Sequence, residues 1–210
     1  MVAIIGDIHG HYTEVFNKMA SVSDPIDFWI QVGDMGGENE EYPDFPVPCY
    51  FVQGNHENWD TIDRMKKGVL PKNVHFISNG SVTEINGLKV LGLGGNYSPR
   101  YSSLKKEKIP PHRRRHYNYE EVYKALQSSN VDIFVTHEAP SPFMKRNNDV
   151  GQPTISNIIG TVKPKVHFFG HHHYYYEGTY FDTPSRGLEY GTLSCILYNP
   201  DDISFKKVIF

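Results

Sequence analysis

The chain has 210 residues, of which 39% are hydrophobic and 21% are charged. This composition is that of a globular protein with enough apolar residues for a core, and the length suits a single domain over residues 1–210. A formal net charge of -3 argues against a protein that coats nucleic acid over its whole surface, although it says nothing about local basic patches.

Two cysteines, Cys49 and Cys195, are too few for a disulfide framework, and we expect both to be small buried side chains. The N-terminus has neither a basic region nor a long apolar run, and no stretch approaches the roughly 18 apolar residues of a membrane span. We therefore expect a cytoplasmic protein with no membrane partner. The 11 histidines are many for this length, and histidine is the commonest metal ligand in proteins.

Short apolar runs alternate with polar segments in the first part of the chain. The runs predict buried strands over residues 2–6, 28–32 and 50–53, and an amphipathic pattern predicts a helix over 12–21. The proline-rich residues 42–48 predict a loop. Each of the three strands ends at a glycine or just before one, which indicates a tight turn out of the sheet.

The second part of the chain begins with a predicted hairpin over residues 82–93. Its turn is the pair Asn86 and Gly87, because both central residues of a type I′ turn need positive φ. Further elements follow from periodicity: helices over 119–127 and 155–162, strands over 131–135 and 166–169, and antiparallel strands over 174–210. Strands that alternate with helices before a β-rich end predict an α/β fold with a mixed sheet.

A residue able to bind a metal follows each of five predicted strands. These residues are Asp7, Asp34, Asn55, His137 and His171. In open α/β sheets the site lies at the carboxyl ends of the strands, so we expect the five loops to converge there. Carboxylate, amide carbonyl and imidazole are suitable ligands for divalent metals.

The five motifs are Gly6-Asp7-Ile8-His9-Gly10, Gly33-Asp34, Gly54-Asn55-His56-Glu57, Thr136-His137 and Gly170-His171-His172-His173. The i, i+2 spacing in the first and last motifs places two side chains on one face of an extended segment, and leaves His172 outside the ligand set. Each motif alone is equally typical of a turn, a helix cap or a hydrogen-bonded histidine. Glu57 and Asp60 are expected to start the next helix, with orientation of His56 as the alternative.

In order and spelling, the five motifs resemble those of the calcineurin-like metallophosphoesterase superfamily. The resemblance implies a β-sandwich of mixed sheets flanked by helices. It implies that Asp7, His9 and His173 hold a first metal ion. It also implies that Asn55, His137 and His171 hold a second, that Asp34 bridges the two, and that His56 faces the substrate as the catalytic residue.

The implied cofactors are two divalent metal ions, Mn first, with Fe, Zn or Ni as alternatives, since no thiolate belongs to the ligand set. Two carboxylates leave about two positive charges at such a centre, which attracts a phosphate anion and a bridging hydroxide. The implied reaction is attack of that hydroxide on a phosphoester. His56 then donates a hydrogen bond or protonates the leaving oxygen.

The substrate class is less closely defined. Serine/threonine phosphatases have an arginine after the second motif, whereas here Met35 and two glycines follow Asp34. A diester monoanion needs less positive charge than a monoester dianion, so we favour a phosphodiesterase acting on nucleotides or nucleic acid. A phosphomonoesterase acting on a small molecule or a protein, and a non-catalytic binding scaffold, are the alternatives.

Residues 74–140 also resemble the core of RNA lariat-debranching enzymes, on the runs Asn73-Val74-His75-Phe76, His116-Tyr117-Asn118-Tyr119 and Thr136-His137-Glu138-Ala139-Pro140. Many of those enzymes have cysteine where Asp7 stands. We expect a compact relative that lacks their recognition loop and C-terminal extension, and not a debranching enzyme.

Residues 105–116 carry six basic side chains against one acidic one and contain Pro110-Pro111, so they predict a basic loop. Such a loop is suited to a nucleic-acid backbone or a nucleotide phosphate. The predicted substrate contacts are Arg113, Arg114, Arg115 and the preceding Arg100. A solvated loop without contact to the substrate is the alternative.

Overall fold

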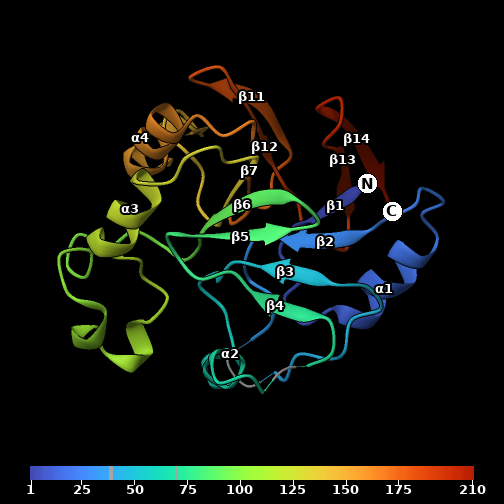
Figure 1. Ribbon diagram of the computed structural model, residues 1–210, viewed down its shortest axis with the longest axis horizontal. Coiled ribbons are helices and arrows are strands. Elements are labelled where there is room, and N and C mark those ends of the chain that lie inside the picture. The colour runs from blue at the N-terminus through green and yellow to red at the C-terminus, as the bar shows by residue number, and fades with distance from the viewer. Residues whose placement is uncertain (38–39, 70) are drawn as a thin grey trace.

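The computed structural model describes residues 1–37, 40–69 and 71–210, and within these ranges most strands belong to two six-stranded sheets (Figure 1). The first sheet contains, in spatial order, β14 (Ser204–Ile209), β13 (Ser194–Asn199), β1 (Val2–Ile5), β2 (Phe28–Gln31), β3 (Cys49–Phe51) and β4 (Val74–Phe76). The second contains β11 (Tyr176–Tyr180), β12 (Thr183–Gly187), β10 (Val166–Phe169), β7 (Ile133–Thr136), β6 (Leu88–Leu93) and β5 (Ser81–Ile85).

The remaining elements are four α-helices, two short 3₁₀ turns and a small hairpin within the described ranges. They are α1 (Tyr12–Ala20), α2 (Trp59–Lys66), η1 (Lys106–Lys108), η2 (Pro111–Arg113), α3 (Tyr119–Leu126), α4 (Pro153–Val162), β8 (Met144–Lys145) and β9 (Asn148–Asp149). Figure 1 shows α1 beside the first sheet and α3 and α4 on the opposite side of the molecule. None of the helices in the described part of the chain has the length and apolar content needed to cross a bilayer.

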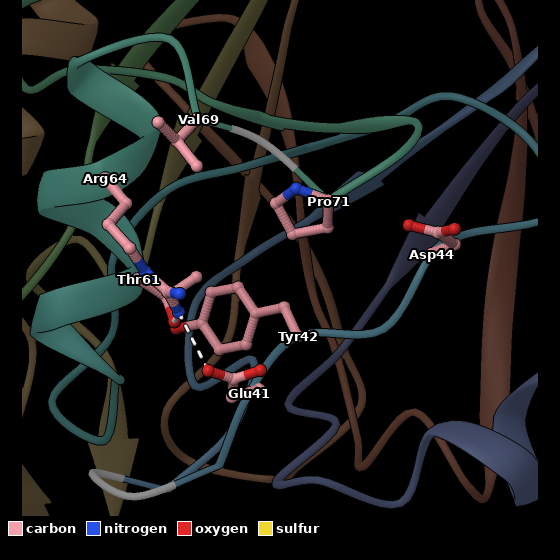
Figure 2. Close-up of a pocket in the computed structure, with 7 residues that line it drawn as sticks. All are labelled: Glu41, Tyr42, Asp44, Thr61, Arg64, Val69 and Pro71. Atoms are coloured by element: carbon pink, nitrogen blue, oxygen red, sulfur yellow. Dashed lines mark hydrogen bonds and ion pairs between the residues drawn. The ribbon is translucent and has the colours of Figure 1, made fainter.

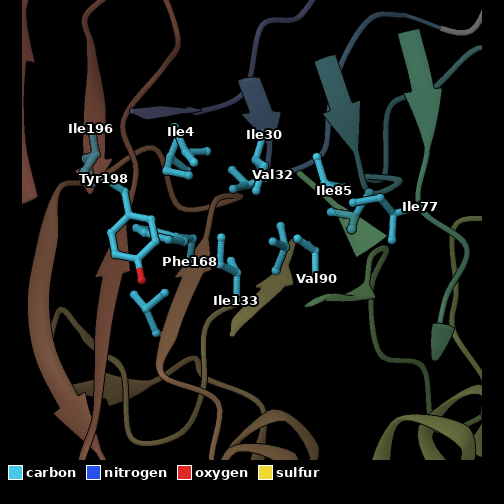
Figure 3. Close-up of a cluster of buried hydrophobic side chains, with 14 of the residues drawn as sticks. Ile4, Ile30, Val32, Ile77, Ile85, Val90, Ile133, Phe168, Ile196 and Tyr198 are labelled. Carbon is cyan, nitrogen blue, oxygen red and sulfur yellow. The ribbon is translucent and has the colours of Figure 1, made fainter. Parts of the chain in front are cut away.

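A buried core shared by both sheets lies between them (Figure 3). Ile4 and Ile30 from the first sheet face Val90, Ile133 and Phe168 from the second, and all five side chains are fully buried. The strands carry β-branched and aromatic residues that pack well on a pleated surface. The predicted β-sandwich of mixed sheets is therefore confirmed.

Helices cover the outer faces of both sheets. On the first sheet, α1 buries Val15 and Met19, and α2 buries Ile62 and Met65. On the second, α3 and α4 pack against the outward-facing residues of β6 and β7. The start of α3 has a capping box: Asn118 accepts from the backbone of Glu121, whose side chain accepts from the backbone of Asn118.

The strand directions determine where the loops lie. β1 to β4 pair in parallel in the first sheet, and β6, β7, β10 and β12 pair in parallel in the second. The carboxyl ends of each parallel set therefore lie along one edge of its sheet. The loops that follow β1, β2, β3, β7 and β10 all start from these edges.

Two expectations are refined by the structure. The strands of residues 174–210 pair antiparallel with one another, β11 with β12 and β13 with β14, as expected, whereas β12 also pairs in parallel with β10 outside this segment. The basic loop is not wholly irregular, since it contains η1 and η2. By contrast, the hairpin turn at Asn86 (φ 50°) and Gly87 (φ 82°) is confirmed, as is the burial of Cys49 and Cys195.

We expect Phe168→Ala to destabilise the protein by about 3–5 kcal/mol, because it removes a fully buried ring from the core between the sheets. Urea denaturation measures this change. The matched control is Tyr123→Ala on α3, whose ring is 63% exposed, and which should change stability by less than about 0.5 kcal/mol. Equal effects of the two substitutions would show that the core between the sheets is not the main apolar contact.

Candidate active site

Five loops meet where the parallel strands of the two sheets end. Asp7, Asp34 and Asn55 follow β1, β2 and β3 of the first sheet, and His137 and His171 follow β7 and β10 of the second. Because the sheets face each other, the two sets of loops lie on opposite sides of one space. The structure thus brings together side chains that are far apart in the sequence.

Two glycines allow the closest approaches between these loops. Gly33 has a φ of 100°, and a methyl group there would overlap the imidazole of His137. A methyl group at Gly54 would overlap the carboxylate of Asp34. Both positions need glycine because the neighbouring side chain occupies the space of a Cβ atom.

The backbone is left-handed at four residues of the site: His9 (φ 49°), Asp34 (57°), His171 (67°) and His173 (53°). This conformation costs about 1–3 kcal/mol for residues other than glycine, and it is concentrated at functional sites. Packing of the surrounding loops overrides the local preference. Its effect is to aim these side chains into the shared space.

A first group of donor atoms belongs to His9, Asp34 and His173, and all of them lie within 4.8 Å of one another. His9 Nε2 lies 3.6 Å from Asp34 Oδ2 and 3.4 Å from His173 Nε2. Asp7 Oδ2 lies 3.4 Å from His173 Nε2. Asp7, His9 and His173 are the three residues that the resemblance assigns to the first metal ion, and Asp34 is the predicted bridging carboxylate.

A second group belongs to Asp34, His137 and His171, again within 4.8 Å. His137 Nε2 lies 3.5 Å from Asp34 Oδ1 and 3.0 Å from Asn55 Oδ1. His137 Nδ1 donates to the carbonyl oxygen of Val32 at 2.9 Å, which leaves the lone pair of Nε2 free to bind a metal. Asp34 therefore contributes one oxygen to each group.

The donor set fits divalent cations. Asp7 is fully buried and Asp34 is 1% exposed, and within the described ranges no lysine or arginine pairs with either. Burial, and next the charge of Asp34, raise the pKa of Asp7 well above its usual value. Burial lowers the pKa of His171 to about 3, so its ring is neutral and able to bind a metal. Buried carboxylates among neutral imidazoles need a cation to compensate them.

The side chain of Glu57 connects the loops that carry Asp34 and Asn55. Its carboxylate accepts from the backbone of Gly54 at 2.7 Å and of Met35 at 3.3 Å, and from the hydroxyl of Tyr42. Burial, and next the charge of Asp34, raise its pKa to about 8. The expectation that Glu57 starts a helix is wrong, because Asn58 caps α2 and Glu57 is instead held between the loops of Asp34 and Asn55.

Tyr42, which hydrogen-bonds to Glu57, also lines a small hollow of about 170 Å³ (Figure 2). Tyr42 lies beside Thr61 and Arg64 of α2, and Arg64 pairs with Glu41 at 3.1 Å. The loop that carries Tyr42 is thereby tied to α2. The residues that line this hollow include none of the donor residues of the two groups.

An open cavity of about 530 Å³ adjoins the first group, and it is lined by His9, His11, His56, His173, Tyr190 and Thr192. The His56 side chain is exposed, its ring lies 5.7 Å from that of His9, and its backbone N–H donates to Asp34 Oδ1 at 2.7 Å. Tyr190 is stacked on His173 with a separation of 3.9 Å between ring centroids. The cavity thus places His56 and an aromatic wall beside the donor atoms.

Sequence reasoning missed two residues of this region. The side-chain nitrogen of Asn96 lies 3.4 Å from His171 Nε2. Asn96 follows β6 after two glycines, so the same pattern of strand, glycine and polar residue could have found it. Tyr190 has no such pattern, because its position depends on the pairing of β13 with β1. His172, excluded from the ligand set, is stacked on Phe143 at 4.8 Å.

The predicted substrate arginines have different surroundings. Arg114 pairs with Asp63 at 2.5 Å, so its charge is partly compensated. The guanidinium groups of Arg100 and Arg113 lie over the ring of Tyr101 at 5.5 and 5.9 Å.

Arg115 is half-buried, and its carbonyl oxygen accepts from the backbone of Asn96 at 2.8 Å. This hydrogen bond fastens the basic loop beside the donor groups through the residue that contacts His171.

A model of the calcineurin-like phosphoesterase family matches residues 1–175. The chain belongs to this family. Membership confirms the expected class of enzyme, a phosphoester hydrolase, and implies divalent metal ions as cofactors.

Among curated proteins, the chain is similar to a lariat debranching enzyme from Entamoeba histolytica. The two are 25% identical, and the match covers 82% of this chain and 63% of that enzyme. Two solved structures share the fold. One, from Thermus thermophilus, has a TM-score of 0.68 at 10% identity and covers 99% of this chain and 97% of that one. The other, a novel archaeal phosphodiesterase, has a TM-score of 0.52 at 13% identity and covers 100% and 99%.

We expect Asp34→Asn to reduce the content of bound divalent metal toward zero, because one carboxylate serves both donor groups. Elemental analysis of the purified protein measures this content. The control Asp60→Asn removes an exposed carboxylate in the first turn of α2 and should leave it unchanged. Retention of one ion at full occupancy in Asp34→Asn would contradict a bridging role.

Proposed function

We propose that this protein is a two-metal phosphodiesterase acting on nucleotides or nucleic acid. The observation that carries the proposal is the carboxylate of Asp34, which contributes one oxygen to each of two groups of donor atoms. A shared carboxylate is the arrangement expected between two neighbouring cations. We propose Asp7, His9 and His173 as the other ligands of one ion, and Asn55, His137 and His171 as those of the other.

Two divalent ions in such a site supply a nucleophile at neutral pH and stabilise the charge of the transition state. The chain's own residues hold the donor atoms in place. His137 is held by its hydrogen bond to the carbonyl oxygen of Val32, and the backbone of His171 donates to Asp7 Oδ2 at 3.1 Å. We propose Mn as the native metal because the donors are oxygen and imidazole nitrogen, with no thiolate. Fe, Zn and Ni are the alternatives.

His56 is the proposed catalytic residue outside the metal ligands. It follows Asn55 directly, and its exposed ring borders the cavity that leads to the donor atoms. Its backbone bond to Asp34 sets the position of the loop, so the ring is free to contact the substrate. There it can donate a hydrogen bond to a phosphoryl oxygen or protonate the leaving oxygen.

The lining of the cavity favours a diester. Among the described residues, those that line it include no lysine or arginine. Met35, at the position after Asp34, is fully buried and offers no charge. A phosphomonoester dianion would require additional positive charge that this wall does not provide, whereas a diester monoanion requires less.

Two observations support a nucleotide or nucleic-acid substrate. The basic loop is fastened beside the donor groups through Asn96, and Arg100, Arg113 and Arg115 have no ion-pair partner among the described residues. The curated relative from Entamoeba histolytica is a debranching enzyme, although the chain spans only 63% of its length. A cytoplasmic location remains our expectation.

A panel of substrates with Mn²⁺ tests the proposal: a bis-aryl phosphate, an aryl monophosphate, a cyclic nucleotide and a short RNA. We expect hydrolysis of the bis-aryl phosphate and of at least one nucleotide substrate, and little or none of the monophosphate, because no lysine or arginine lines the described part of the cavity. Release of the aryl group and chromatography of the nucleotides measure the rates. Faster hydrolysis of the monophosphate than of the diester would overturn the diester assignment.

We expect His56→Ala to lower kcat by about 10²–10⁴-fold on the preferred diester, because it removes the proposed proton donor. The metal content should stay at the wild-type value, since the ring is not a ligand. The control His75→Ala removes a histidine of β4 that is stacked on Tyr50 at 4.7 Å, and kcat should not change. Unchanged turnover in His56→Ala would exclude His56 from the mechanism.

A further inference from the structure

A small hairpin, β8–β9, projects beside the last motif of the candidate site. Its two turn residues, Arg146 (φ 49°) and Asn147 (φ 66°), both have positive φ, as a type I′ turn requires. Asparagine and glycine are common in such turns, whereas arginine is not. The turn therefore holds a long cationic side chain at a position where local preference does not favour it.

The base of the hairpin is firmly held. Asp149 accepts from the backbone of Phe143 at 2.8 Å and of Gly151 at 2.9 Å, and from the hydroxyl of Ser141. The carboxylate is thereby engaged at the base and does not pair with the cations at the tip. In the described part of the chain, Lys145 and Arg146 have no ion-pair partner.

A cavity of about 240 Å³ lies against this hairpin, and it is lined by Phe143, Met144, Lys145, Arg146 and Tyr174. Met144 is 62% exposed and Tyr174 is 63% exposed. Phe143, by contrast, is buried. Two large exposed apolar side chains and two unpaired cations thus surround one hollow, which is just below the size range of pockets for small molecules.

The last motif lies between this cavity and the candidate active site. Tyr174 directly follows His173, which belongs to the first donor group and lines the cavity beside His56. The ring of His172 is stacked on Phe143 at 4.8 Å. The loop from His171 to Tyr174 therefore separates two hollows, one with the metal donors and one with the cations of the hairpin.

We propose that the hollow between the β8–β9 hairpin and Tyr174 is a second substrate subsite, which binds a nucleoside phosphate adjacent to the reacting diester. Lys145 and Arg146 bind its phosphate, and Tyr174 and Met144 contact its base. Arginine and lysine are the usual phosphate-binding residues, and an exposed tyrosine offers a face on which any base stacks. The assignment rests on the proposed phosphodiesterase function, because a second subsite serves a substrate that continues beyond the reacting bond.

The test measures binding of adenosine 5′-monophosphate, adenosine and inorganic phosphate to the full chain by calorimetry, with metal bound and again after chelation. We expect the monophosphate to bind more tightly than either fragment. The double variant Lys145→Ala/Arg146→Asn should weaken its binding by roughly 10-fold or more in both states, since the loss of even one charge-assisted hydrogen bond corresponds to about that factor. Tyr174→Ala should weaken binding of the monophosphate and of adenosine, whereas Tyr174→Phe should not.

The controls separate binding from folding. Arg146→Asn introduces a residue that the turn prefers, so the melting temperature should not fall when affinity does. The variant Lys67→Ala/Lys72→Ala removes the same charge from exposed lysines that line neither hollow, and affinity should not change. Equal affinity of wild type and the hairpin variant, or equal loss in the lysine control, would overturn the subsite.

Failure of the subsite and failure of the proposed function give different results. Binding after chelation requires no hydrolysis, so a protein that cleaves no diester could still bind the nucleotide at the hairpin. Conversely, hydrolysis of a bis-aryl phosphate with wild-type rates in the hairpin variant would leave the phosphodiesterase proposal intact. The hairpin variant could lose affinity for phosphate while adenosine contributes nothing to binding. That result would reduce the subsite to an anion site and exclude the base contact.

Discussion

The whole architecture depends on the close contacts that the carboxylate of Asp34 makes. This carboxylate occupies the space that a side chain at Gly54 would need, accepts a hydrogen bond from the backbone of His56, and lies close to His137 from the opposite sheet. Its own backbone is left-handed and follows a glycine. These contacts can form together only if β2, β3 and β7 end at the same level. The sandwich of two mixed sheets, in which these strands belong to the parallel sets, meets that requirement, and the buried core between the sheets keeps the ends in register.

The convergence of these loops buries two carboxylates and strains the loop backbone. Asp7 and Asp34 are buried with no lysine or arginine paired to them in the described ranges, and four residues of the site have left-handed backbone. In a protein without a cation, repulsion between the two carboxylates would oppose the packing that brings them together. Cation binding offsets this repulsion, so folding stability and metal affinity depend on the same carboxylates.

Much of the fold was accessible from sequence because its determinants are local. Apolar runs that end in glycine mark β1, β2, β3 and β10, and Asn86-Gly87 marks the β5–β6 turn. The convergence of the loops could also be inferred, since parallel strands end at one edge. The features that the sequence did not predict depend on contacts between residues far apart in the chain. Tyr190 reaches the cavity only because β13 pairs with β1, Glu57 braces two loops through Tyr42, and Arg114 is paired with Asp63 from α2. No pattern within a few residues records these contacts.

The hydrogen bond from His137 to Val32 has a consequence for how the centre acquires its ions. A carbonyl oxygen can only accept, so the proton of the imidazole is on Nδ1 and the tautomer is decided by the backbone of the other sheet. Burial also lowers the pKa of this ring. If His137 is a ligand as proposed, an ion would meet a nitrogen that carries no proton and a ring that is already oriented. Binding there would need neither deprotonation nor a change of rotamer, because folding of the sandwich has already set both.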